Sequence, residues 1–192
     1  MKLEKIQKEL EKTLSPKRFR HSAGVADMAR HLAHLYGASE EKACLAGWIH
    51  DAAKEMTLSE MQHIVKKAHL TFDDAEHMLK SRALLHGPAG SVLAKTAFGI
   101  DDEEIRGAIY YHTTGRVGMT LLEKIVFLAD YIEPNRDFPG VEDLRSLAEK
   151  DLDQAVLAAY DSTISHLIEQ GAYIYGLTFL GRNDMVEKLA KH

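Results

Sequence analysis

The doublet His50-Asp51 places an imidazole and a carboxylate side by side directly after the apolar run "ACLAGWI". A segment that is apolar on every side is typical of a helix at the centre of a fold, so this helix would carry both side chains into the interior. An unpaired carboxylate costs several kcal/mol in an apolar interior, and Asp51 therefore needs a partner. Taken alone, the doublet is most simply a buried structural pair.

Two further polar side chains are expected to face the same interior. On a helical wheel of residues 21–37, His21 falls at the centre of an apolar stripe. The stripe consists of Val25, Met28, Leu32 and Leu35. Asp130 lies inside "KIVFLADYIEP", which is also apolar nearly all round. Each of these two side chains alone would again be read as a structural residue.

Together, two inward imidazoles and two inward carboxylates form a plausible ligand set for a divalent metal. His21, His50, Asp51 and Asp130 would leave coordination positions for water and substrate, and one cation would satisfy the burial of all four. A nitrogen and oxygen set without thiolate suits Fe, Mn, Co, Ni or Zn and does not distinguish them.

Three basic residues lie next to these ligands in the sequence. Arg18 precedes the first imidazole by three residues, Lys54 follows the carboxylate of the doublet by three, and Arg136 comes one short turn after the Asp130 helix. A lone basic residue is usually a solvated surface charge. Three of them beside proposed metal ligands indicate a polyanionic substrate, for which phosphate is the obvious candidate.

Two more histidines are predicted at helix ends. His86 precedes "GPAG" and is expected at a helix N-terminus, whereas His112 is expected where a helix closes on Gly115. Either could be an ordinary cap residue; in a metal pocket they become candidates for a second metal, for phosphate contacts or for general acid duty. The other histidines are expected to be solvated or peripheral, namely His31, His34, His63, His69, His77, His166 and His192.

The elements that must position these residues are predicted to be helices throughout. Apolar residues recur at helical spacing along 192 residues that include only four prolines, and no linker or repeat divides the chain. The predicted helices cover residues 3–14, 22–35, 40–54, 59–68, 75–84, 89–98, 102–112, 121–132, 141–149 and 152–170. The tail "GAYIYGLTFLGRND" is expected to be extended or a loop. The fold class predicted is all-α, in one domain.

Composition excludes several classes of protein. A formal net charge of -5 argues against a protein that coats nucleic acid, and no apolar run approaches the roughly 18 residues of a membrane span. The single cysteine, Cys44, and the polar start "KLEKIQKELEK" favour a reducing cytoplasm without a signal peptide. Amphipathic helices would permit a homodimer, but no heptad pattern requires one.

Longer stretches around these residues resemble one known family. The segments "RFRHSAGVADMA", "HDAAKE", "LLHGPAGSVLA", "AIYYHTTGRVGMTLLEKIVFLADYIEPNRDFPGVEDLR" and "DLDQAV" are similar to the bacterial YqeK family of HD-domain metal-dependent phosphohydrolases, over roughly residues 15–183. The resemblance implies an HD-domain helical bundle, with an HD core of about residues 15–135 and a helical extension of about 136–192. It also implies symmetrical hydrolysis of diadenosine tetraphosphate to two ADP with a bound iron or similar metal.

The resemblance also assigns roles to residues of this chain. It implies metal ligation by His21, His50, Asp51 and Asp130. It implies nucleotide contacts near Arg18, Lys54, His86, His112, Thr113, Gly115 and Arg136. Asp51, His86 and His112 are the expected catalytic residues, either histidine protonating the departing phosphate oxygen. If both histidines bind metal instead, the site is dinuclear and Asp51 is the bridging ligand.

Two other functions remain open at this point. The same ligands would serve an HD phosphodiesterase or nucleotidase acting on a cyclic nucleotide, a dNTP or a guanosine polyphosphate, because only the pocket beyond the metal distinguishes such substrates. A non-catalytic nucleotide sensor with a structural metal is the alternative from a different class.

Overall fold

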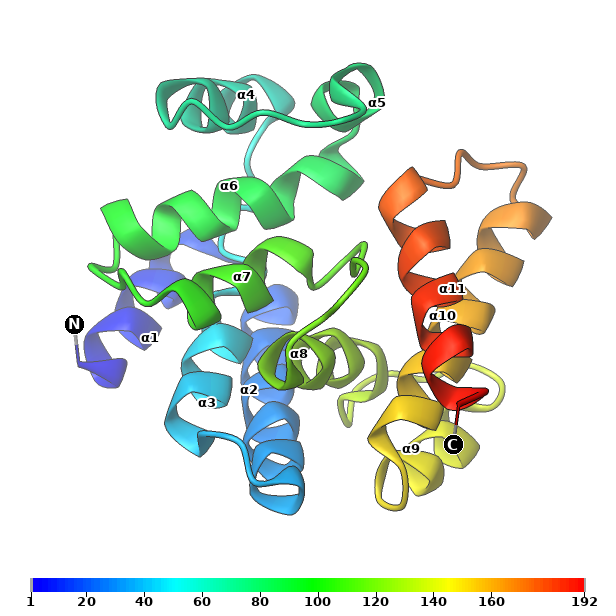
Figure 1. Cartoon of the computed structure of the whole chain (residues 1–192). Coiled ribbons are helices and arrows are strands. Elements are labelled where there is room, and N and C mark those ends of the chain that lie inside the picture. Colours follow the sequence, from blue (N-terminus) through cyan, green and yellow to red (C-terminus); the bar gives the residue numbers. More distant parts are fainter. Residues whose placement is uncertain (1, 192) are drawn as a thin grey trace.

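The computed structural model describes residues 2–191, and within that range the chain is built of α-helices without a strand (Figure 1). The all-α prediction is confirmed. The helices are α1 (Leu3–Thr13), α2 (Pro16–Tyr36), α3 (Glu40–Ile49), α4 (Leu58–Lys67), α5 (Ala75–Lys80), α6 (Arg82–Thr96), α7 (Glu103–Tyr111), α8 (Leu121–Ile132), α9 (Val141–Ala148), α10 (Leu152–Glu169) and α11 (Gly176–Leu189). Across the described residues, no helix combines the length and the apolar character needed to cross a bilayer.

The helix that precedes the doublet lies at the centre, as predicted. Six of the ten residues of α3 are buried, and the helix contacts α2, α7 and α8. Gly47 permits the closest of these approaches, because a Cβ at this position would lie 2.6 Å from the Cα of Ala26 on α2. The backbones of α2 and α3 can therefore pack directly against each other, which brings the end of α3 close to the first turns of α2.

Two predicted boundaries near the doublet are wrong. Helix α2 begins at Pro16 rather than residue 22, because Ser15 caps it by accepting a hydrogen bond from the backbone N–H of Arg18. Helix α3 ends at Ile49 rather than residue 54, and residues 50–55 form turns. The apolar stripe of α2 ends at Leu32, since Leu35 is 43% exposed.

Helix α6 corrects a third boundary. The sequence predicted a break over residues 85–88, whereas α6 runs through Pro88, and His86 lies inside the helix instead of at its N-terminus. Pro88 removes one backbone donor, but Ser81 caps the helix, and nine buried residues hold it in the core. Gly87 lets α7 approach closely, because a Cβ there would lie 2.7 Å from the carbonyl oxygen of Tyr110.

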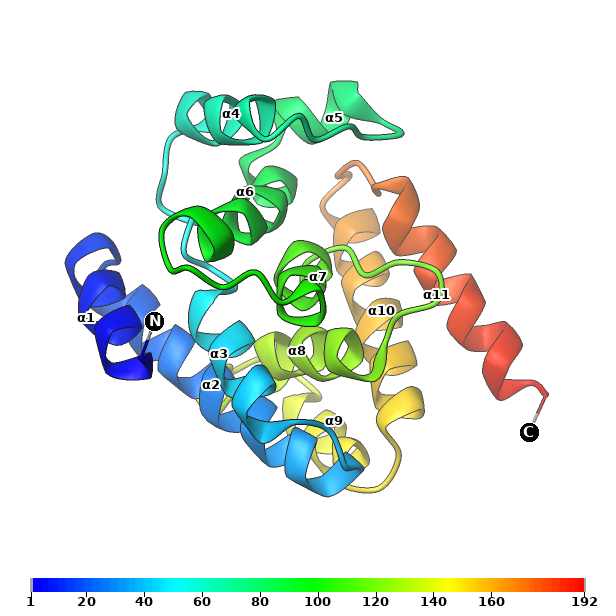
Figure 2. The ribbon, with the colours of Figure 1, turned by 60° about the vertical axis from the view of Figure 1, so that its left-hand side comes forward.

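The remaining helices surround this centre. In both views α4 and α5 cover α6, and the α10–α11 pair flanks α7 and α8 (Figures 1 and 2). The connection between α10 and α11 reaches α5, where the Tyr173 ring stacks on His77 with centroids 3.7 Å apart.

Residues 171–175 of the tail form a turn and a loop, as predicted, but the prediction is wrong from residue 176 onward, because residues 176–189 form α11. Its buried positions, Thr178, Gly181 and Met185, recur at helical spacing. Thr178 is polar and Gly181 has no side chain, so Met185 alone does not register as an apolar stripe. Gly181 packs against Tyr160 of α10, whose hydroxyl oxygen would lie 2.4 Å from a Cβ at that position.

Candidate active site

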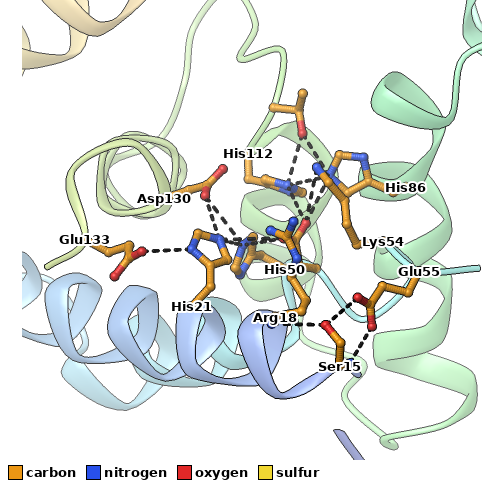
Figure 3. A network of polar contacts seen from close by, with 12 residues as sticks. Ser15, Arg18, His21, His50, Lys54, Glu55, His86, His112, Asp130 and Glu133 are labelled. Carbon is orange, nitrogen blue, oxygen red and sulfur yellow. Dashed lines mark hydrogen bonds and ion pairs between the residues drawn. The ribbon is translucent and has the colours of Figure 1, made fainter. Parts of the chain in front are cut away.

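The predicted polar residues converge from different helices on one place (Figure 3). Helix α2 supplies Arg18 and His21, the turn after α3 supplies His50, Asp51 and Lys54, α6 supplies His86, the end of α7 supplies His112 and α8 supplies Asp130. All four of these histidines are at most 8% exposed, Asp51 is 1% exposed, and Asp130 is half-buried.

One group of donor atoms gathers around His21. Its Nε2 lies 3.0 Å from Oδ1 of Asp130 and 3.3 Å from Nε2 of His50. The distance from His50 Nε2 to the same Asp130 oxygen is 3.8 Å. These three side chains can each offer one ligand atom to a common metal ion.

A second group lies on the far side of Asp51. Nε2 of His86 is 2.9 Å from Nε2 of His112, and these atoms are 3.2 Å and 3.7 Å from Oδ1 of Asp51. The hydroxyl of Thr113 lies 3.2 Å and 3.0 Å from the same two nitrogens. The other carboxylate oxygen of Asp51 faces His21 and His50, at 3.6 Å and 3.4 Å. Asp51 therefore stands between two sets of imidazoles.

Backbone carbonyls fix the orientation of three of the imidazoles. His50 Nδ1 contacts the carbonyl oxygen of Gly47 at 2.6 Å, His112 Nδ1 that of Ile109 at 2.7 Å, and His86 Nδ1 that of Arg82 at 3.3 Å. A neutral imidazole that donates from Nδ1 carries its lone pair on Nε2. Three Nε2 lone pairs are thereby turned toward Asp51, and metal-binding histidines are typically held in this way, with the other ring nitrogen donating to a carbonyl or carboxylate.

The protonation states of His50, His86 and Asp130 also fit a bound cation. At His21, burial is outweighed by hydrogen bonds to Asp130 and Glu133, which raise the pKa of the imidazole. Burial lowers the pKa of His50, and burial lowers that of His86 to about 4, so both imidazoles are neutral near pH 7. Burial opposes ionisation of Asp130, but its hydrogen bond to His21 and the charges of its neighbours, among them Arg136, hold its pKa well below the usual range.

Asp51 provides the direct test of the fit. Its Oδ1 is buried and receives no aligned hydrogen bond from any residue between 2 and 191, although imidazole nitrogens surround it. An unsatisfied carboxylate oxygen at this depth is costly. A divalent cation between this oxygen and the facing Nε2 atoms would satisfy it, so the residues present fit a metal.

The three predicted cations lie against the ligands. Arg18 donates from Nη1 to Oδ2 of Asp51 at 2.6 Å, and Arg136 donates from Nη2 to Oδ1 of Asp130 at 2.7 Å. Lys54 Nζ lies 3.1 Å from His86 Nε2. All three side chains remain about one-third exposed. They can therefore contact an anion that approaches the metal ligands from solvent.

The structure explains why residue 115 is glycine without reference to a nucleotide. It ends the turn after α7 with φ at 60°, in the left-handed region, and a Cβ there would lie 1.6 Å from the hydroxyl oxygen of Tyr160. This position therefore excludes larger residues whether or not a nucleotide binds. The predicted nucleotide contact at Gly115 stays a prediction.

Sequence reasoning missed Glu133. This carboxylate is 1% exposed and accepts a hydrogen bond from Nδ1 of His21 at 3.0 Å. Asn135 donates to its other oxygen from the backbone and from the side chain, both at 2.8 Å. Gly24 makes room for it, since a Cβ there would lie 2.3 Å from Oε2. The available signal was its position three residues after Asp130, on the same side of α8.

Replacing Glu133 by glutamine is expected to weaken metal binding by about 10- to 100-fold, the usual effect of altering a group that orients a histidine ligand. A neutral amide is a poorer acceptor for His21 Nδ1–H and no longer fixes which ring nitrogen faces the metal. Titration of metal-free protein against a competing chelator measures the affinity. Glu169→Gln, an exposed position at the end of α10, is the matched control; equal affinities in the two variants would contradict the role given to Glu133.

Comparisons with known proteins agree with this geometry. The HD domain family matches residues 18–135, a range that contains both groups of donor atoms. A protein of Halalkalibacterium halodurans named symmetrical bis(5'-nucleosyl)-tetraphosphatase is 41% identical over 173 residues, which cover 90% of this chain and 91% of that protein. The proteins of the same name from Bacillus subtilis and Staphylococcus aureus are 41% and 38% identical, over 90% and 93% of this chain and 91% of each relative.

A solved structure agrees over nearly the whole length. The protein from Clostridium acetobutylicum described as a predicted HD superfamily hydrolase involved in NAD metabolism is 41% identical, with a TM-score of 0.93 over 98% of each chain. Since the HD domain covers more than half of the chain and the relatives align with about nine-tenths of it, the chain belongs to the HD-domain family and, within it, to the family of proteins named symmetrical bis(5'-nucleosyl)-tetraphosphatase.

Proposed function

We propose that this protein is a metal-dependent hydrolase that cleaves diadenosine tetraphosphate and related dinucleoside polyphosphates symmetrically, to two nucleoside diphosphates. The relatives at 38–41% identity carry this activity in their name. The observation that carries the proposal is the buried Asp51 carboxylate. Imidazole nitrogens face both of its oxygens, and Arg18, whose side chain is partly exposed, donates to Oδ2.

Two adjacent metal positions are proposed. His21, His50, Asp51 and Asp130 would hold the first, and His86 and His112 would share Asp51 with a second. A divalent metal at these ligands supplies a Lewis acid, which polarises phosphoryl oxygens and lowers the pKa of water. The sequence favoured a single metal with a second as an option; the 2.9 Å approach of two imidazole nitrogens favours the dinuclear version.

His86 and His112 suit metal ligation better than proton donation. Each has its Nδ1 directed at a backbone carbonyl, and burial lowers the pKa of His86 to about 4. A neutral imidazole whose only proton is already donated to the backbone has none to give to a leaving group. The catalytic role proposed for both histidines is therefore to hold the metal.

The basic residues are proposed to bind the phosphate chain. Symmetrical cleavage requires attack at one of the two inner phosphorus atoms with ADP as the leaving group. Arg18, Lys54 and Arg136 surround the ligand set and would neutralise the charge that develops there, in keeping with phosphoryl transfer being chiefly a matter of positioning and electrostatics. Thr113, in contact with both outer histidines, would donate its hydroxyl to a phosphate oxygen.

We further propose that the metal is iron, that the product is ADP and that the protein forms a homodimer in the cytoplasm without nucleic-acid partners. The chain would divide into an HD core and a helical extension from about residue 136.

Hydrolysis of a nucleotide panel tests the proposed function. Metal-reconstituted protein is incubated with diadenosine tetraphosphate, a cyclic nucleotide, a dNTP and a guanosine polyphosphate, and the products are separated and identified. We expect ADP alone from diadenosine tetraphosphate and much slower turnover of the others. A mixture of AMP and ATP would contradict symmetrical cleavage, and absence of turnover with every metal would favour the sensor.

A further inference from the structure

A cleft of about 530 Å³ opens beside His21. It runs from the metal ligands between the first turns of α2 and the segment that follows α8, where Arg136 and Phe138 line it. Figure 3 shows Asp130 and Glu133 on this side of His21, with Lys54 and His86 on the opposite side. The cleft therefore extends from the metal ligands toward solvent on the side away from Lys54 and His86.

The cleft is lined by four basic residues, of which two form ion pairs with the carboxylate ligands. Arg18 and Arg136 are engaged by Asp51 and Asp130. Lys17 and Arg20 also line the cleft; both are exposed and make no ion pair within the described part of the chain. They are three residues apart on α2, so their side chains share a face.

The two carboxylates in the lining offset only part of this charge. Glu133 is turned inward to His21 and Asn135, and Asp137, which is exposed, offsets one of the positive charges. Phe138 adds a half-buried aromatic ring to the same wall, packed against Tyr131 with ring centroids 5.1 Å apart. A cleft of this volume with several cations and one aromatic ring has the size and chemistry of a small-molecule site for an anionic ligand with an apolar part.

We propose that this cleft binds one nucleoside diphosphate half of the substrate, with Lys17 and Arg20 on its phosphates and Phe138 beside its nucleoside. The inference rests on the proposed function, because attack at an inner phosphorus leaves two phosphates and one nucleoside on each side of the metal ligands. One half must extend away from Lys54 and His86, and the cleft lies in that direction. Lys17, Arg20 and Phe138 are specificity-determining residues in this arrangement.

The double variant Lys17→Ala/Arg20→Ala tests the phosphate contacts. Loss of two charge-assisted contacts is expected to raise both the KM for diadenosine tetraphosphate and the Kd for ADP by about tenfold or more. The value of kcat should stay within about twofold and the metal content per chain should not change. Lys67→Ala/Lys150→Ala removes the same charge from exposed positions, and its KM and Kd should match those of the unmodified protein.

Phe138→Ala tests the nucleoside contact. It is expected to weaken ADP binding, measured by calorimetry on metal-loaded protein, while leaving the Kd for inorganic pyrophosphate unchanged. Because Phe138 packs on Tyr131, Phe138→Leu repeats the measurement with less loss of packing, and thermal unfolding checks that both variants fold. Equal losses for ADP and pyrophosphate would overturn the assignment of the nucleoside to Phe138.

Different results would contradict the cleft assignment and the proposed hydrolase function. If the unmodified protein hydrolyses diadenosine tetraphosphate but the Lys17→Ala/Arg20→Ala variant keeps its KM and its Kd for ADP, the cleft assignment is wrong and the function stands. If no dinucleoside polyphosphate is hydrolysed but the same variant loses ADP affinity, the cleft assignment stands and the proposed function is wrong.

Discussion

Asp51→Asn is expected to lower kcat for diadenosine tetraphosphate by at least about a thousandfold. Among residues 2–191, Asp51 is the one carboxylate that faces both groups of imidazoles, so it is the ligand that both proposed metal positions would share. A metal supplies several kcal/mol of transition-state stabilisation in such sites, and about 4 kcal/mol corresponds to a thousandfold in rate. An amide keeps the shape of the side chain but is neutral, and it forfeits that contribution.

A stability measurement separates this effect from misfolding. Without metal, the substitution removes an unsatisfied buried Oδ1 but also weakens the contact of Oδ2 with Arg18, so the Asp51→Asn variant should unfold within a few degrees of the unmodified protein in chelator. With metal at about 100 times its Kd, the unmodified protein should gain about 2.7 kcal/mol, or roughly 5–10 °C in Tm. The variant should lose most of that gain.

Asp27→Asn serves as the control, because this residue lies on α2 with an exposed side chain. It should retain both the activity and the metal-dependent rise in Tm. If Asp51→Asn keeps either the rate or the full metal-dependent rise, Asp51 is not the shared ligand.

The metal ligands could be predicted because their burial follows from strong local patterns. The helix before His50 is apolar on every side, and such a helix is stable only at the centre of a domain, where all its faces are buried. The wheel position of His21 remained correct even though α2 begins six residues earlier than predicted, because an earlier start does not rotate the helix. The longer helix also places Arg18 one turn before His21, the condition under which the two share a face.

His86 shows what local patterns cannot give. A proline two residues later normally marks a helix start, and the sequence offers no reason to expect otherwise. The helix continues because packing against α4, α5 and α7 outweighs one lost backbone hydrogen bond. His86 is thereby buried and faces His112, whereas at a helix N-terminus it could have been a surface cap.

Glu133 was missed for a related reason. A glutamate just before a proline reads as the solvated end of a helix, and its burial depends on the space that Gly24 leaves on α2. That space is a property of two helices that are distant in sequence, so neither segment alone indicates it. The outer residues of a site that orient its ligands are generally set by such tertiary fits.

His86→Ala and His112→Ala are each expected to reduce the bound metal from two ions per chain to one and to lower kcat by about a hundredfold or more. The reason is geometric: their Nε2 atoms lie 2.9 Å apart and both face Asp51 Oδ1. With Nδ1 of each imidazole directed at a backbone carbonyl, the two Nε2 lone pairs converge, and a cation between them and Asp51 Oδ1 would stabilise this arrangement. A proton shared between the two nitrogens is disfavoured, because burial lowers the pKa of His86 to about 4.

Elemental analysis of protein reconstituted with excess metal and then desalted gives the ratio of metal to chain. Alanine at either buried position leaves a cavity that costs stability. His86→Gln and His112→Gln therefore repeat the measurement with side chains of similar size. His166→Ala, at an exposed position on α10, is the control and should keep the full ratio of metal to chain. A ratio unchanged from the unmodified protein in the folded glutamine variants would eliminate the second metal position. The two histidines would then be left with a role in binding phosphate. A ratio that falls by one, together with the loss of rate, would place His86 and His112 among the metal ligands with His21, His50, Asp51 and Asp130.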